Sequence, residues 1–414
     1  MELRTGVSSK RVPSKKPAKK PVRSIPAESE ELRGPKKIQE KFRLFSVRLG
    51  LDMAFLFLVL ALLIIGILMM FSASYPSGLV YENDSFFYLK KQVIFAMIGL
   101  AAMIGLSYLD YHYWHILAYA VLAVALIALI WVLFVPTNGV RRWIYIGGLG
   151  SFQPSEIAKL AVVLVMADWA SRHGKKMGTL KYGVAAPAGM FGVILILMVL
   201  EPHYSGIAII FMLTMLMMFI GGTKIHWIIG IIIVLGIGVV IAAFTGLLGY
   251  AMERMDGWGQ ALNPPDDLYW NTYQTRNSIY AIGSGGFWGV GLGMSKQKYL
   301  YIPEVQNDFV FAVVCEELGF IGAAVILVLF GLLVYRGITI SLKAKDRFGA
   351  LLGIGLSAQI GIQVILNILV ITDGMPNTGI SLPFFSYGGT SLVMLLAQMG
   401  IILSVSRTSN LEKA

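Results

Sequence analysis

The sequence has few charged residues and a single cysteine. Only 14% of its 414 residues are Asp, Glu, Lys or Arg, whereas 57% are hydrophobic. A water-soluble domain carries about 25% charged residues, so this chain has too little charge to cover a water-exposed surface. One cysteine, Cys315, excludes an internal disulfide. These shortages predict a protein that folds in lipid.

A cleavable signal peptide is also lacking, because the N-terminal basic region is too long and no small-residue cleavage site follows the first apolar run. Since a membrane span needs about 20 residues, the apolar runs predict an all-α polytopic membrane protein with about ten transmembrane helices. The runs are 51–73, 92–109, 114–135, 156–170, 182–200, 206–222, 227–246, 309–335, 348–371 and 389–406.

The basic residues predict the orientation. Fourteen of the 34 lie in the first 50 residues, and with that end inside, 25 lie on the cytoplasmic side and eight in outer loops. We therefore expect two cytoplasmic termini and a large extracellular loop, 247–307, between helices 7 and 8. A loop of this length is usually functional or disordered, and its aromatic residues favour function. The net charge of +11 suits an anionic membrane surface, and no nucleic-acid motif accompanies it.

The expected domain organisation follows from these patterns. Residues 1–43 are basic and nearly free of aromatics, which predicts a disordered cytoplasmic tail. Residues 44–406 form the membrane domain, with 247–307 as its outer loop. Residues 407–414 form a short cytoplasmic tail.

Two pairs of charged residues near the outer face are candidate ligand contacts. Arg141 and Arg142 precede Trp143, which fits either an interfacial anchor or a grip on an anionic headgroup. Glu156 and Lys159 lie three residues apart, hence on one face of a helix. Charges inside a membrane tend to pair and to face a cavity, so they mark either a site or a packing ion pair.

Carboxylates also gather where the eighth apolar run begins. Asp308 fits a helix cap, a general base or a metal ligand. Glu316, eight residues further, lies about 12 Å deeper along a helix. A turn before the last run offers Ser386, Gly388 and Gly389 as donors for a phosphate or sugar. The five histidines have no metal-ligand spacing.

Four sequence blocks, in order, resemble the SEDS family (shape, elongation, division and sporulation) over residues 50–406. They are GVRRWI (139–144) with QPSEIAK (153–159); AIGSGG (281–286) with GVGLG (289–293); PE (303–304) with NDF (307–309) and EELG (316–319); and LPFFSYGG (382–389). The chain resembles the FtsW and SpoVE branch more than the RodA branch, which typically has an insertion after AIGSGG. It departs from the family at Glu201–Gly206 (EPHYSG), where many members have QPDLGT, and at Gln306-Asn307, where many have His-Thr.

The resemblance implies a peptidoglycan glycosyltransferase that polymerises lipid II at the outer face of the bacterial plasma membrane. It implies that Asp308 matches the family's essential acidic residue, and that Glu156 and Lys159 match its charged pair. The substrate contacts expected with them are Arg141, Arg142, Glu316, Ser386, Gly388 and Gly389.

The same resemblance implies a class B penicillin-binding protein, other division proteins and membrane lipids as partners, at the division or spore septum. We expect a divalent cation (Mg²⁺ or Mn²⁺), with Asp308 as a candidate ligand, and no organic cofactor. A lipid II flippase and a non-catalytic scaffold of the division machinery are the alternatives.

Overall fold

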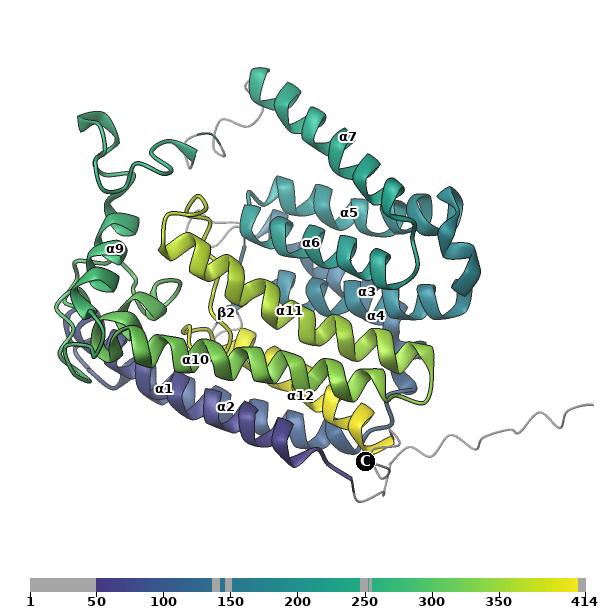
Figure 1. The fold of residues 1–414 in the computed structure, drawn as a ribbon, viewed down its shortest axis with the longest axis horizontal. Coiled ribbons are helices and arrows are strands. Elements are labelled where there is room, and N and C mark those ends of the chain that lie inside the picture. The colour runs from purple at the N-terminus through teal and green to yellow at the C-terminus, as the bar shows by residue number, and fades with distance from the viewer. Residues whose placement is uncertain (1–49, 136–141, 146–150, 246–251, 253–254, 409–414) are drawn as a thin grey trace, which may run out of the picture. The chain divides into compact units, whose positions relative to one another are not determined.

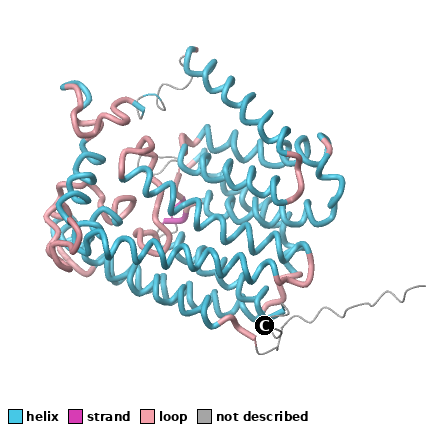
Figure 2. The backbone as a smooth tube through the Cα atoms, in the orientation of Figure 1, coloured by secondary structure: helices cyan, strands magenta, loops and turns pink. Residues whose placement is uncertain are grey.

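The computed structural model describes residues 50–135, 142–145, 151–245, 252 and 255–408. Most of them are helical (Figures 1 and 2). The helices are α1 Met53–Glu82, α2 Phe87–Tyr108, α3 Tyr113–Phe134, α4 Pro154–His173, η2 Gly174–Gly178, η3 Lys181–Ala185, α5 Ala186–Leu200, α6 Tyr204–Ile220, α7 Ile225–Phe244, η4 Asp266–Leu268, α9 Tyr273–Gly285, α10 Val310–Leu342, α11 Arg347–Ile371 and α12 Gly389–Thr408. The short strands β1 (Ile144–Tyr145) and β2 (Ser151–Phe152) pair antiparallel.

Each of the ten predicted apolar runs overlaps one long helix, α1 to α7 or α10 to α12. Seven described helices are long and apolar enough to cross a membrane. Helices α6 and α7 contribute shorter apolar segments. Helix α4 is long, but it carries four charged residues. The helical class is confirmed, and the chain is an integral membrane protein, whereas the count of ten spans and the sidedness of the termini stay predictions.

Apolar side chains cover the outside of the outer helices. Phe57 and Ile64 on α1, Met97 on α2 and Ile127 on α3 each expose more than half of their surface. A soluble monomer rarely exposes so continuous an apolar surface, so these faces suit contact with lipid. Helix α7 lies apart from the others, as Figure 1 shows, and it packs mainly along α6.

The core is built around α4, which packs against α3, α6 and α11. All residues from Ala158 to Ala167 on this helix are buried. Small residues bring α12 and α2 together: a Cβ at Gly400 would lie 2.5 Å from the Met103 carbonyl oxygen, and one at Gly99 would lie 2.6 Å from Leu396 Cδ1. Close approach at glycine is a usual basis of helix packing in membranes.

The connection between α7 and α10 is folded in its described part, 255–307. It contains η4 and α9, and α9 packs against α10. Helix α10 is kinked at Gly319, where φ is 67° and ψ is −170°. At this kink the Glu316 carbonyl accepts from Val290 N at 3.0 Å, and Phe320 N donates to the Gly286 carbonyl at 2.9 Å. The kink therefore binds the connection to α10 through the backbone.

Ionisable groups pair at the end of the bundle that the sequence places inside. His115 Nδ1 lies 2.5 Å from Asp168 Oδ1, and Arg172 Nε lies 2.8 Å from the same oxygen. Asp346 accepts from the Tyr111 hydroxyl and from the amide of Phe348. These contacts tie the inner ends of α3, α4 and α11 together.

Candidate active site

A cavity of about 1320 Å³ lies among the helices. Its walls come mainly from α2, α4, α11 and α12, and from the connections that precede α4, α6, α10 and α12. Glu82 of α1, Ser205 of α6 and Gln274 of α9 also line it. The topology predicted from the basic residues places these connections outside. Among the described residues, none of the connections at 109–112, 221–224 and 343–346, predicted inside, contributes to the lining.

Asp308 lies in the cavity wall, two residues before α10 begins. Its backbone carbonyl accepts a hydrogen bond from Asn367 Nδ2 at 2.8 Å. Its carboxylate lies beside Gly379, where a Cβ would be 3.0 Å from Asp308 Oδ2. The N-cap position of α10 belongs to Phe309, so Asp308 is not the cap of this helix. Helix α11 and the loop at Gly379 thus hold a half-buried carboxylate at the cavity.

Glu156 and Lys159 form the ion pair that their spacing predicted. Lys159 Nζ lies 2.8 Å from Glu156 Oε1, and both residues are buried. Pro154 begins α4, which places Glu156 in the first turn, where the helix dipole favours a negative charge. Glu156 lines the large cavity, and both residues line a small polar cavity of about 30 Å³ beside it.

Of the two predicted arginines, Arg142 lies in the cavity wall, and Arg141 is outside the described residues. Arg142 Nη2 donates to the Pro202 carbonyl at 2.5 Å. This bond brings the connection between α5 and α6 to the cavity. Arg142 is half-buried, so its positive charge lies at the edge of the cavity.

The sequence did not predict Glu201 or His203 as site residues; its one signal was the departure from the family pattern. Glu201 is buried, and this burial raises the pKa of its carboxyl to about 8 although Arg142 opposes the shift. His203 lines both cavities, and its Nε2 lies 3.2 Å from Gln153 Nε2. Burial, followed by the charges of Arg142 and Lys159, lowers the pKa of His203 to about 3. A neutral imidazole therefore lies next to the ion pair.

Ser386, Gly388 and Gly389 all line the cavity. The first two lie in the turn before α12, and Gly389 is the first residue of that helix. Ser386 is mostly buried, and its hydroxyl accepts from Leu382 N at 2.7 Å, which closes the turn. A Cβ at Gly389 would lie 2.2 Å from a ring carbon of Phe95 on α2. Glycine is therefore required there for the close approach of α2 and α12.

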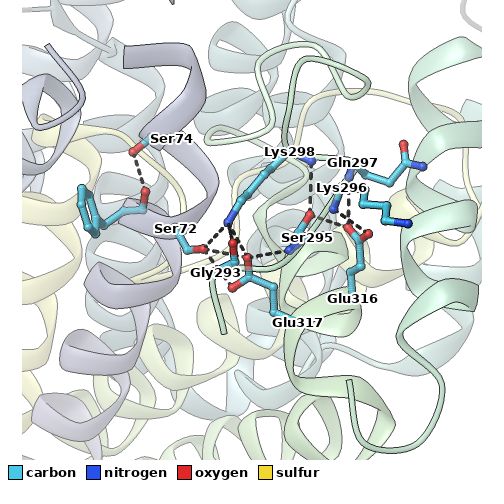
Figure 3. A network of polar contacts seen from close by, with 10 residues as sticks. Ser72, Ser74, Gly293, Ser295, Lys296, Gln297, Lys298, Glu316 and Glu317 are labelled. Atoms are coloured by element: carbon cyan, nitrogen blue, oxygen red, sulfur yellow. Dashed lines mark hydrogen bonds and ion pairs between the residues drawn. The ribbon is translucent and has the colours of Figure 1, made fainter. Parts of the chain in front are cut away.

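Glu316 lies away from the cavity. Its carboxylate accepts from the Ser295 hydroxyl, from Lys296 N at 2.9 Å and from Gln297 N at 3.3 Å (Figure 3). Glu316 thus holds the connection, and the substrate contact predicted for it stays a prediction. The kink at Gly319 turns this part of α10 towards residues 295–297.

Glu317, part of the EELG block and not predicted as a site residue, completes this network. Its Oε1 lies 2.8 Å from Lys298 Nζ and 2.7 Å from the Ser72 hydroxyl of α1. Figure 3 shows Lys298 and Ser72 meeting at this carboxylate. All three are buried, so the connection between α7 and α10 is fastened to both α1 and α10.

Amide side chains form the inner wall of the cavity, another feature that the sequence did not predict. Gln359 and Gln363 on α11 and Gln398 on α12 line it near the middle of their helices. Within the described structure, Gln359 Oε1 and both terminal atoms of Gln398 are buried without a hydrogen-bond partner. Such atoms need water or a ligand, because an unmet buried polar group costs about 1–3 kcal/mol.

The described residues contain no group of three or more His, Cys, Asp or Glu side chains able to hold a metal. A dedicated protein cage for a cation is therefore not found in this part of the chain. Mg²⁺ is commonly held by one or two carboxylates together with substrate phosphates. Asp308 lines the cavity and could supply one such carboxylate.

Comparison with known proteins identifies the family. The family model of the FtsW/RodA/SpoVE cell cycle proteins matches residues 53–411. The chain belongs to the FtsW/RodA/SpoVE family. This finding confirms the SEDS resemblance seen in the sequence.

Relatives in this family include both members of the predicted branch. Stage V sporulation protein E of Bacillus subtilis is 37% identical, over 86% of this chain and 97% of that protein. A probable peptidoglycan glycosyltransferase FtsW of Geobacter sp. (strain M18) is 36% identical over the same shares. These relatives confirm the enzyme class that the sequence predicted.

Solved structures of the FtsW/RodA/SpoVE family share the fold. A chain of a peptidoglycan synthase complex that coordinates polymerization and crosslinking superposes with a TM-score of 0.71, at 28% identity over 88% of this chain and 99% of that one. The rod shape determining protein RodA of Thermus thermophilus gives 0.63, at 27% identity over 87% and 98%.

Proposed function

We propose that this peptidoglycan glycosyltransferase polymerises lipid II into glycan strands at the outer face of the bacterial plasma membrane. The observation that carries the proposal is the half-buried carboxylate of Asp308 in the wall of a 1320 Å³ cavity. A cation, Arg142, and the Glu156–Lys159 pair lie at the same cavity. A general base near a cation suits a transfer that expels a pyrophosphate.

In the proposed reaction, Asp308 accepts the proton of the acceptor GlcNAc 4-hydroxyl. That oxygen forms a bond to the anomeric carbon of the donor MurNAc, while the bond from this carbon to the pyrophosphate oxygen breaks. The electron pair leaves with undecaprenyl pyrophosphate. The donor is α-linked and the product β-linked, so a single inverting displacement with one base is sufficient, as in inverting glycosidases.

In this proposal the other charged residues bind and orient the substrate. Arg142 offers a planar guanidinium to phosphate oxygens. Glu156 holds Lys159 in place through the ion pair, so that Lys159 contributes a positive potential near the leaving group. A divalent cation, Mg²⁺ or Mn²⁺, would be held by Asp308 together with substrate phosphates and would supply charge neutralisation there.

The proposal extends to topology and partners. We place ten spans in the membrane with both termini inside, because ten helices match the apolar runs and the basic residues favour this orientation. A class B penicillin-binding protein would crosslink the product, and other division proteins and lipids would surround the enzyme at a division or spore septum. The structural neighbour from a peptidoglycan synthase complex supports such an arrangement.

The test is glycan formation from purified lipid II by the full chain with its crosslinking partner. We expect polymer from wild type and from Asp373→Ala, and none from Asp308→Ala. Asp373 is the matched control, because it is an acidic residue in the next outer connection that does not line the cavity. Equal polymer from wild type and Asp308→Ala would remove Asp308 from the mechanism.

One observation favours the flippase as a second candidate. Gln359 and Gln398 bring polar atoms into the cavity near the middle of their helices, as a path for a headgroup would require. Against it, the described lining contains none of the connections predicted inside, and the pairs at Asp168 and Asp346 close that end. Movement of lipid II between leaflets of protein-containing vesicles, without polymer, would favour the flippase; no movement and no polymer would favour the scaffold.

A further inference from the structure

The wall that α2 contributes to the cavity combines one cation with an apolar strip. Lys91 lies about one turn into α2 and lines the cavity together with Ile94, Phe95 and Ile98. At about 100° per residue, these four side chains fall within roughly 100° of one helix face. Ile98 lies about 10 Å further along the helix axis than Lys91. The charge is therefore at the outer end, and the strip descends towards the middle of the membrane.

The positive charge of Lys91 is directed to the cavity. Its Nζ lies 4.0 Å from the centre of the Phe87 ring, and within the described structure no carboxylate pairs with it. The adjacent Lys90 differs, because its Nζ lies 2.7 Å from Asp84 Oδ2 and it is not part of the lining. A contact with an aromatic face leaves the lysine charge available to an anion.

The α2 wall is held firmly against the turn that precedes α12. Gln92, fully buried, donates to the Ser386 carbonyl at 3.2 Å and accepts from Gly388 N at 3.4 Å. Tyr88 and Tyr387 pack edge to face with ring centres 5.0 Å apart. Lys91 is therefore carried by a fixed helix that is bonded to the candidate site.

The apolar strip is accessible to a lipid chain. Ile94 exposes 59% of its surface and Ile98 exposes 50%, so both are open on one side while lining the cavity on the other. Another part of the lining, α4 and its preceding connection, carries Arg142 and Glu156 and is more polar. One wall thus has the chemistry of an anionic lipid site, and the other has the chemistry of a sugar-phosphate site.

We propose that Lys91 binds the pyrophosphate of a polyprenyl-linked molecule whose chain lies along Ile94 and Ile98. The inference deepens the proposed function, since polymerisation joins two lipid-linked molecules and each brings a pyrophosphate. Arg142 and Lys91 would then serve separate pyrophosphates on different walls. The shared chemistry is a phosphate-bearing lipid headgroup, which either a polyprenyl pyrophosphate or a bulk anionic phospholipid would supply.

The test is equilibrium binding of undecaprenyl pyrophosphate to the purified full chain in detergent. We expect Lys91→Gln to weaken binding by about tenfold, as the loss of one charge-assisted contact predicts. Lys90→Gln should bind within about twofold of wild type, and Lys91→Arg should restore most of the affinity. Uncharged undecaprenol should bind equally to wild type and Lys91→Gln.

Two results would overturn the proposal. One is equal affinity of wild type and Lys91→Gln for undecaprenyl pyrophosphate, with both variants folded by their melting temperatures. The other is a loss of affinity for phosphatidylglycerol in Lys91→Gln that equals its loss of affinity for undecaprenyl pyrophosphate. That result would assign Lys91 to the bulk membrane surface. The outcome is separate from that of the proposed function: binding that depends on Lys91 without polymer would contradict only the polymerase, and polymer with unchanged binding would contradict only the Lys91 site.

Discussion

The Glu156–Lys159 ion pair is buried at the start of α4, so removing one partner alone should destabilise the protein. Glu156→Gln leaves the Lys159 ammonium buried without its partner, so we expect a loss of roughly 3–5 kcal/mol in the free energy of unfolding. The double variant Glu156→Gln/Lys159→Met removes the stranded charge and should recover part of that loss. Thermal unfolding in detergent measures both. Equal stability of wild type and Glu156→Gln would show that the pair contributes nothing to folding.

The buried carboxyl of Glu201 should make stability depend on pH. Its pKa is about 8 in the folded protein and about 4.5 in an unfolded chain, so the folded state binds more protons between these values. Stability therefore falls as pH rises through this window. His203 affects the pH dependence of stability only below about pH 6.5, which is its ordinary pKa.

Between pH 6.5 and 8 we expect wild type to lose up to about 2 kcal/mol relative to Glu201→Gln. Melting temperatures of the two proteins across this range provide the measurement. Parallel curves for the two proteins would contradict the assigned protonation of Glu201.

Local spacing predicted part of the site and missed the rest. Glu156 and Lys159 pair because side chains three residues apart on a helix lie on the same face. Glu316 could not be located in this way, because its partners lie on a connection whose path depends on the kink at Gly319. Spacing also could not tell that Lys91, and not Lys90, faces the cavity.

At the scale of the element, the kink in α10 should depend on glycine at position 319. Its φ of 67° with ψ near −170° is almost restricted to glycine, and a Cβ there would lie 2.3 Å from Gly289 N. Gly319→Ala should therefore lower stability by about 1–3 kcal/mol or more and loosen the outer connection.

Gly331 is the matched control, since it lies in the same helix and a Cβ there meets no atom within 4 Å. Gly331→Ala should leave stability unchanged or slightly higher. Hydrogen exchange of residues 286–302 reports the connection directly. Equal protection in the two variants would refute the role of the kink.

Helices were the most predictable elements because apolar runs persist over the length of a span. All ten runs matched a helix, with boundaries shifted by up to nine residues, at the end of α1. Helix α9 and the strands β1 and β2 were not predicted, since each is short and owes its structure to contacts with distant parts of the chain. The prediction for residues 1–43 falls outside the described residues. Of the predicted tail 407–414, Arg407 and Thr408 belong to α12, and 409–414 fall outside the described residues.

At the scale of the molecule, the orientation in the membrane is open to a direct test. The chain has one cysteine, Cys315, which is buried, so Cys315→Ala provides a cysteine-free background. We expect Lys296→Cys to react with a membrane-impermeant maleimide in cells whose plasma membrane is intact and whose outer layers admit the reagent. Lys345→Cys should react only after the membrane is broken. Both side chains are exposed, so labelling in the reverse order would invert the topology.

The molecule as a whole gathers Asp308, the cations Arg142 and Lys91, and the Glu156–Lys159 ion pair at one large cavity. The sequence indicated most of these residues, but not that helices and connections far apart in the chain would enclose them. That enclosure arises from α2, α4, α11 and α12 packing at glycines and from amide bonds such as that of Asn367 to the Asp308 carbonyl. Such long-range contacts have no local signature.

The central claim is that Asp308 performs the transfer within this cavity. The most direct test measures lipid II binding and polymer formation on the same preparation of Asp308→Asn. The account predicts binding within about threefold of wild type and a rate lower by about 10²–10⁴-fold, as expected for loss of a general base. A rate near that of wild type, with binding intact, would contradict it.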